Sequence, residues 1–112
     1  MAALGTKLRQ GVDGNGDEWV GHWCPGCRCA HVFYVNRDKR PCWTFDGNSE
    51  APTFTPSMRI FVPADTEDGT PEQTLCHYIL TAGVINFLAD SSGHELRGDI
   101  PLPTFPADYR LE

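Results

Sequence analysis

The chain has 112 residues, nine prolines, eleven glycines and a net charge of −6. This length predicts one domain, residues 1–112, with a modest core and many turns. The acidic excess argues against a surface that binds nucleic acid phosphates, and without a run of about 18 apolar residues the sequence predicts no membrane-spanning helix.

Residues 1–17 are predicted to form a loosely ordered segment, since their second part is rich in glycine and polar side chains. Asp and Asn alternate there as in a calcium loop, but no glutamate closes the loop, which favours a simple turn. No long apolar stretch follows Met1. We therefore expect no secretion signal and a cytoplasmic location, in which cysteines stay reduced.

The most informative stretch is a pair of cysteines, Cys24 and Cys27, around Pro25-Gly26. Two intervening residues are the spacing of a metal knuckle, whose tight turn places both sulfur atoms on one side of the backbone. Strands are predicted on either side, over residues 18–23 and 30–35, so the pair caps a β-hairpin as in a zinc ribbon. The spacing predicts structural Zn²⁺; a redox dithiol and two ordinary buried cysteines are the alternatives.

Tetrahedral zinc needs about four ligands, so two more must come from elsewhere. Cys76 is the preferred distant sulfur ligand, because it lies near the start of a predicted strand where the chain can bend. His94 is favoured as the fourth ligand, since it lies in a polar loop that is free to reach the knuckle. His31 and His77 are its competitors, and Cys29 is a further local candidate.

An aromatic stretch over residues 42–48 and a proline-rich stretch over residues 51–57 follow a charged turn. Their aromatic side chains Trp43, Phe45 and Phe54 are predicted either to pack in the core or to form a rigid ligand groove. In the second case, Thr and Ser hydroxyls at its rim would suit a peptide or a flat ligand. The sequence leaves both interpretations open.

The second half of the chain predicts further strands at residues 57–62, 75–80 and 84–88. An acidic loop of surface residues separates the first two, and Gly83 supplies the turn between the last two. One short helical turn is predicted within residues 90–98, and residues 100–106 are predicted to be extended. Together these elements predict a small, mostly β, antiparallel fold with a zinc-ribbon-like knuckle and little helix.

A small basic cluster, Arg37, Lys39 and Arg40, is the only support for nucleic acid binding. Three charges on a loop are usually just solvated, and residues 41–112 carry three basic against eleven acidic side chains. The sequence therefore favours a protein partner and makes a nucleic acid partner unlikely by its charge.

Several motifs occur in a recognisable order after the knuckle. They are Trp43-Thr44-Phe45-Asp46-Gly47, Pro52-Thr53-Phe54-Thr55-Pro56-Ser57, Cys76-His77, Gly83 through Leu88, and His94-x-Leu96-x-Gly98. This set, over roughly residues 22–105, resembles a family of small phage and prophage proteins of unassigned function, some of which are labelled ammonia monooxygenase. The resemblance implies a phage context in a bacterial host cell and a shared metal site, and it supplies no reaction. Those relatives often have a cysteine where this chain has Ser91, so position 91 is excluded as a ligand.

Two functions compete on these grounds. The first is a zinc-stabilised β module, without catalytic residues, that binds a host or phage protein through its acidic half and its aromatic segment. The second is a metal-dependent hydrolase built around His77, Asp90 and His94, with Asp90 as a base or as the group that orients a histidine. The sulfur-rich ligand set is typical of closed structural zinc and favours the first function.

Overall fold

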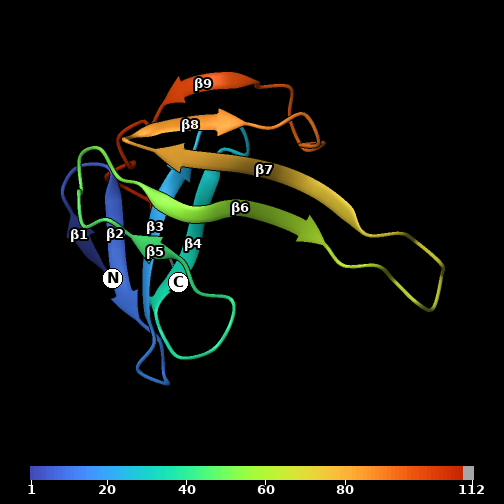
Figure 1. Ribbon diagram of the computed structural model, residues 1–112, viewed down its shortest axis with the longest axis horizontal. Helices are drawn as coiled ribbons and strands as arrows, with labels where there is room; N and C mark the ends of the chain where they lie inside the picture. Colours follow the sequence, from blue (N-terminus) through green and yellow to red (C-terminus); the bar gives the residue numbers. More distant parts are fainter. Residues whose placement is uncertain (110–112) are drawn as a thin grey trace.

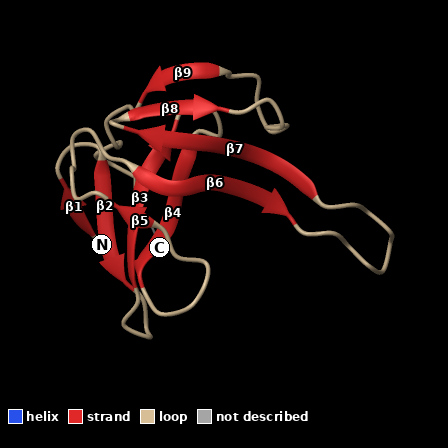
Figure 2. Ribbon diagram, viewed as in Figure 1, coloured by secondary structure: helices blue, strands red, loops and turns tan. Residues whose placement is uncertain are grey.

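The fold consists of two antiparallel β-sheets. The computed structural model describes residues 1–109, and within them every regular element is a strand, with no helix (Figure 2). This confirms the predicted mostly β, antiparallel fold. No helix within residues 1–109 is long and apolar enough to cross a membrane.

The first sheet has the strand order β1-β2-β3-β4. Its strands are β1 (Ala2–Leu4), β2 (Leu8–Val12), β3 (Glu18–Cys24) and β4 (Cys29–Asn36). Residues 1–17, which were predicted to be loosely ordered, contain the two short strands β1 and β2. Leu8 is fully buried and lies opposite His22 on β3, so one apolar side chain anchors β2 to the sheet.

The second sheet has the strand order β5-β6-β7-β8-β9. Its strands are β5 (Thr44–Phe45), β6 (Phe54–Val62), β7 (Gln73–Thr81), β8 (Val84–Phe87) and β9 (Gly98–Pro101). The helical turn predicted within residues 90–98 is wrong, because residues 90–97 form an irregular segment and β9 follows it. The loop between β6 and β7 projects well beyond the rest of the fold (Figure 1), and residues 61–73 are exposed, as the acidic composition predicted.

One hydrophobic core joins the two sheets. Buried side chains from both sheets meet in it: Leu8, Val20, Cys24, Phe33, Phe54, Met58, Cys76, Tyr78, Leu80, Ile85, Phe87 and Leu102. Strand alternation on β7 sends Cys76 and Tyr78 into this core and His77 to the opposite face. The division of the chain into a single domain, residues 1–112, stays a prediction.

The aromatic residues of the second sheet separate into two groups. Phe54 is only 1 % exposed and stacks on Phe45 with ring centroids 5.0 Å apart, which agrees with core packing for this pair. Trp43 packs edge-on against Phe33 of β4, with centroids 4.8 Å apart. The ligand groove of Trp43, Phe45 and Phe54 stays a prediction.

Candidate active site and metal centre

Strand β7 carries two neighbouring residues that serve different clusters. Cys76 is fully buried and points into the core, whereas the His77 side chain is 23 % exposed on the outer face. Successive side chains on a strand point to opposite faces, so a single strand supplies both clusters without their sharing a ligand.

The inner cluster contains the four residues that the sequence analysis preferred as metal ligands. One ligand atom from each of Cys24, Cys27, Cys76 and His94 lies within 4.8 Å of all the others. The Cys27 backbone N–H points at the Cys24 sulfur, 3.4 Å away, as expected of a knuckle turn. Three sulfurs and one imidazole at these separations fit a tetrahedral divalent metal, although the cluster alone does not identify the ion.

The electrostatics of the cluster suit a cation. A hydrogen bond from Cys76 lowers the pKa of Cys24 to about 6, and the same contact raises the pKa of Cys76. Burial raises the pKa of Cys27 to about 11 and lowers that of His94. These shifts favour a thiolate at Cys24 and a neutral imidazole at His94, and a bound cation would displace the remaining thiol protons.

The competing histidines lie outside this cluster. His31 is buried, and its Nδ1 lies 2.9 Å from the Tyr78 hydroxyl. The same hydroxyl contacts His22 Nε2 at 2.5 Å. Burial lowers the pKa of His22 to about 4 and that of His31 to about 3, so both stay neutral in the core. Cys29, the other local candidate, is half-buried and is also outside the cluster.

On the outer face, His77 lies between a serine and an aspartate. Its Nδ1 is 3.0 Å from both carboxylate oxygens of Asp90, and its Nε2 is 3.2 Å from the Ser57 hydroxyl. Because a carboxylate only accepts hydrogen bonds, Nδ1 carries the proton and Nε2 is free to accept from Ser57. Ser57 is exposed, so a substrate can reach it. This chain of contacts has the geometry of a Ser-His-Asp catalytic triad.

The position of Ser57 depends on an irregularity in β6. The pairing of β6 with β7 shifts register between Phe54 and Met58, and Ser57 lies within that shift. Bulges of this kind redirect a side chain and are common beside active sites. The Trp43 indole N–H donates to the Ser57 carbonyl at 3.2 Å, which ties the serine backbone to the segment before β5.

The position of Asp90 depends on the segment that follows it. The Ser91 hydroxyl accepts from the His77 backbone N–H at 2.9 Å and donates to the His77 carbonyl at 3.1 Å. Farther on, the Gly93 N–H donates to the Leu75 carbonyl at 2.7 Å. A side chain at Gly93 would place its Cβ 2.9 Å from that carbonyl oxygen, so this close approach requires glycine. The residues after Asp90 thus run along β7 and hold the carboxylate beside His77.

The structure regroups the residues that the sequence analysis assigned to a hydrolytic site. His77 and Asp90 do lie together, but His94 belongs to the cysteine cluster. Their third partner is Ser57, which sequence reasoning missed. Ser57 lies between Pro56 and Met58, outside any nucleophile motif with flanking glycines, so the sequence offered no signal for it.

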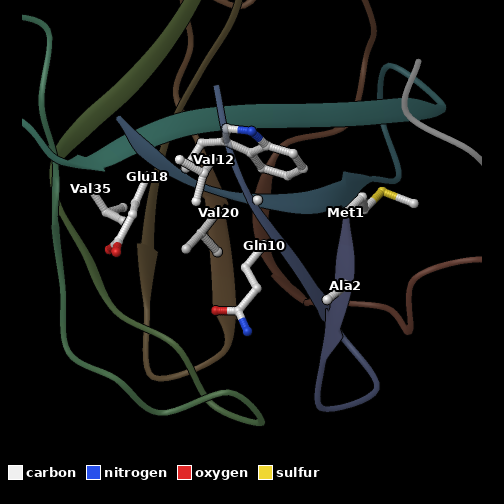
Figure 3. A pocket seen from close by; sticks show the side chains of 9 residues that line it. Met1, Ala2, Gln10, Val12, Glu18, Val20 and Val35 are labelled. Atoms are coloured by element: carbon white, nitrogen blue, oxygen red, sulfur yellow. The ribbon is translucent and has the colours of Figure 1, made fainter. Parts of the chain in front are cut away.

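A cleft of about 370 Å³ lies beside Pro56, the residue before Ser57 in the chain. It is lined by Arg40, Pro41, Cys42, Trp43 and Pro56. Another cleft, of about 520 Å³, lies along β7, β8 and β9 and is lined by Ile79, Thr81, Val84, Asn86 and Asp99. A third, of about 380 Å³, lies over the first sheet, where side chains such as Gln10, Glu18 and Val35 surround it (Figure 3). This third cleft contains no member of the triad or of the cysteine cluster.

A comparison with protein families identifies the chain. The family model described as "Bacterial ubiquitination-like system serine protease (BubE)" matches residues 5–88, a range that includes Ser57 and His77 and ends just before Asp90. No curated protein and no solved structure matches the chain.

This match overturns two expectations from the sequence. The resemblance to phage and prophage proteins of unassigned function is wrong. The expected function, a phage-type zinc-binding interaction module with a metal-dependent hydrolase around His77, Asp90 and His94 as its alternative, is also wrong, since the family is one of serine proteases. The chain belongs to the BubE family, the serine proteases of bacterial ubiquitination-like systems.

Proposed function

We propose that this protein is a serine protease that acts in a bacterial ubiquitination-like system, with Ser57 as nucleophile. The observation that carries the proposal is the continuous hydrogen-bonded chain from Ser57 through His77 to Asp90. The family description supports it independently. The protein partner expected from the sequence is, on this proposal, the polypeptide substrate itself.

In this mechanism, the Ser57 hydroxyl attacks the scissile carbonyl while His77 Nε2 takes the hydroxyl proton. Asp90 keeps the Nδ1 proton in place and stabilises the imidazolium that forms. His77 then gives the proton to the leaving amine, and an acyl group remains on Ser57. Water, activated by the same histidine, releases the acyl group and restores the serine.

The proposed role of the inner cluster is to hold the triad together through a structural Zn²⁺. Four protein ligands leave no open position on a tetrahedral ion, and a sulfur-rich ligand set is typical of structural zinc. Cys76 precedes His77 directly, and His94 follows Asp90 by a few residues. A metal bound to both would therefore fix the chain on either side of the His77–Asp90 pair.

The nucleophile can be tested with a fluorophosphonate probe, which forms a covalent bond with an activated serine. We expect one adduct per chain on Ser57, located by peptide mass spectrometry. A Ser49→Ala variant is a matched control that should still be labelled, because Ser49 makes no contact with His77. Absence of labelling in the folded protein, or an adduct on another serine only, would refute the proposed nucleophile.

A glycine in the knuckle tests the proposed zinc site. A Cβ at Gly26 would lie 2.3 Å from His94 Nε2, so Gly26→Ala should push this imidazole away from the three sulfurs. We expect the Zn²⁺ affinity, measured by competition with a chromogenic chelator, to fall by about 10- to 100-fold. Gly14→Ala is the control, since nothing lies within 4 Å of its Cβ position. Equal affinities in the two variants would remove His94 from the ligand set.

A further inference from the structure

The cleft lined by Arg40, Pro41, Cys42, Trp43 and Pro56 includes two residues that are linked to the proposed nucleophile. Pro56 precedes Ser57 in the chain, and the Trp43 indole is hydrogen-bonded to the Ser57 carbonyl. The cleft is therefore connected to Ser57 by both the backbone and a hydrogen bond. A polypeptide whose scissile carbonyl lies at the Ser57 hydroxyl can place a neighbouring side chain in this cleft.

The strand order indicates whether the acyl half or the leaving half of a substrate would enter the cleft. Strand β6, with Ser57, lies between β5 and β7. His77 is on β7, whereas Trp43 precedes β5 on the other side of the serine. Because the histidine must protonate the leaving amine, the leaving half of the substrate lies over β7. The cleft on the β5 side then receives the acyl half, on the N-terminal side of the scissile bond.

The charges around the cleft select the kind of side chain. Arg40 is exposed at its rim, and no hydrogen bond or ion pair of Arg40 occurs within residues 1–109. Its neighbour Arg37 already has partners within the protein. The Arg37 guanidinium lies over the Tyr34 ring, and its Nε–H donates to the Pro41 carbonyl at 2.9 Å. The hydrogen bond from Arg37 to Pro41 stabilises the turn that contains Arg40. The other walls are rigid and largely apolar, so Arg40 is the one full charge lining the cleft.

We infer that this cleft is a specificity subsite for an acidic side chain on the acyl half of the substrate, with Arg40 as the residue that recognises it. A guanidinium binds a carboxylate through two parallel hydrogen bonds, and the proline and tryptophan walls would exclude water from that pair. The cleft along β7, β8 and β9 instead carries an acidic residue, Asp99. This inference rests on the proposed protease function.

Paired peptides test the subsite. Internally quenched peptide pools, randomised on the leaving side, would carry either Glu or Gln at each of the first few positions before the scissile bond. For the wild-type protein, we expect kcat/KM to be about tenfold higher for Glu than for Gln at one of these positions. In Arg40→Gln, this ratio should fall to about one, and in the matched control Lys39→Gln it should stay at the wild-type value. A ratio cancels any general loss of activity in a variant.

The outcomes separate this inference from the proposed function. If the wild-type protein cleaves Glu and Gln peptides equally at every position, or if Arg40→Gln keeps the preference, the subsite is refuted while the protease stands. If no peptide is cleaved and the fluorophosphonate probe does not label Ser57, the protease itself is refuted, and the subsite falls with it.

Discussion

Ser57→Ala is expected to lower peptide cleavage by about 10⁴-fold or more, because it removes the hydroxyl that lies 3.2 Å from His77 Nε2 and is proposed to attack the substrate. The loss should appear in kcat, measured with the peptide pool that the wild-type protein cleaves best. Ser57 is exposed, and within residues 1–109 its hydroxyl is hydrogen-bonded only to His77. The free energy of unfolding of the variant should therefore lie within about 0.5 kcal/mol of that of the wild type.

Asp90→Asn distinguishes a triad from a lone serine. The amide cannot hold the same His77 tautomer as a carboxylate, so kcat should fall by about 10²- to 10⁴-fold, which is less than for loss of the nucleophile. The Asp90 side chain is 57 % exposed, and water can replace part of its effect. A Ser57→Ala protein that keeps most of its activity would rule out the proposed mechanism, whatever Asp90→Asn does.

Loss of the metal is expected to unfold the protein. Structural zinc contributes on the order of 10 kcal/mol in small domains, which is comparable with the whole stability of a chain of this size. Cys24→Ser removes a fully buried member of the cysteine and histidine cluster and should prevent folding, as should an excess of chelator. Elemental analysis of untreated protein should find about one zinc per chain.

Cys29→Ser is the matched control for this experiment. Cys29 lies opposite Cys24 in the register of β3 and β4 but outside the cluster. Its loss should therefore leave the zinc content and the thermal stability close to those of the wild type. Activity should disappear in parallel with the fold during chelation, because Cys76 and His94 lie on either side of His77 and Asp90 in the chain. A folded and active protein that holds no metal would refute the structural role of the site.

The cluster of Cys24, Cys27, Cys76 and His94 could be predicted from the sequence because few residue types ligate zinc. The spacing of Cys24 and Cys27 predicted two of the ligands. Cys76 was then predicted from its place near the start of a strand, and His94 from its place in a polar loop. The structure brings those four side chains together. Here the chemistry of the side chains restricted the choices even though the ligands are far apart in the sequence.

The proposed triad could not be predicted from the sequence, because its nucleophile belongs to a common residue type. Serine is a common surface residue, and Ser57 acquires meaning only from a register shift in β6 that no local pattern predicts. The alternation of β7 correctly separated Cys76 from His77, but it gave no indication of what His77 faces. The N-terminal strands were missed because they are short and Leu8 alone among their side chains is buried, so they lack a recognisable alternation.

Because Cys76 and His77 point to opposite faces of β7, metal binding would depend on the register in which β7 pairs with β6. If β7 slipped by one residue against β6, each of its side chains would move to the other face of the sheet. Cys76 would leave the cluster in the same step in which His77 left Ser57. Zinc would therefore bind fully only to chains whose strands are paired in the native register, and those are the same chains in which the histidine reaches the serine. Misaligned forms would lack metal, stability and proteolytic activity together.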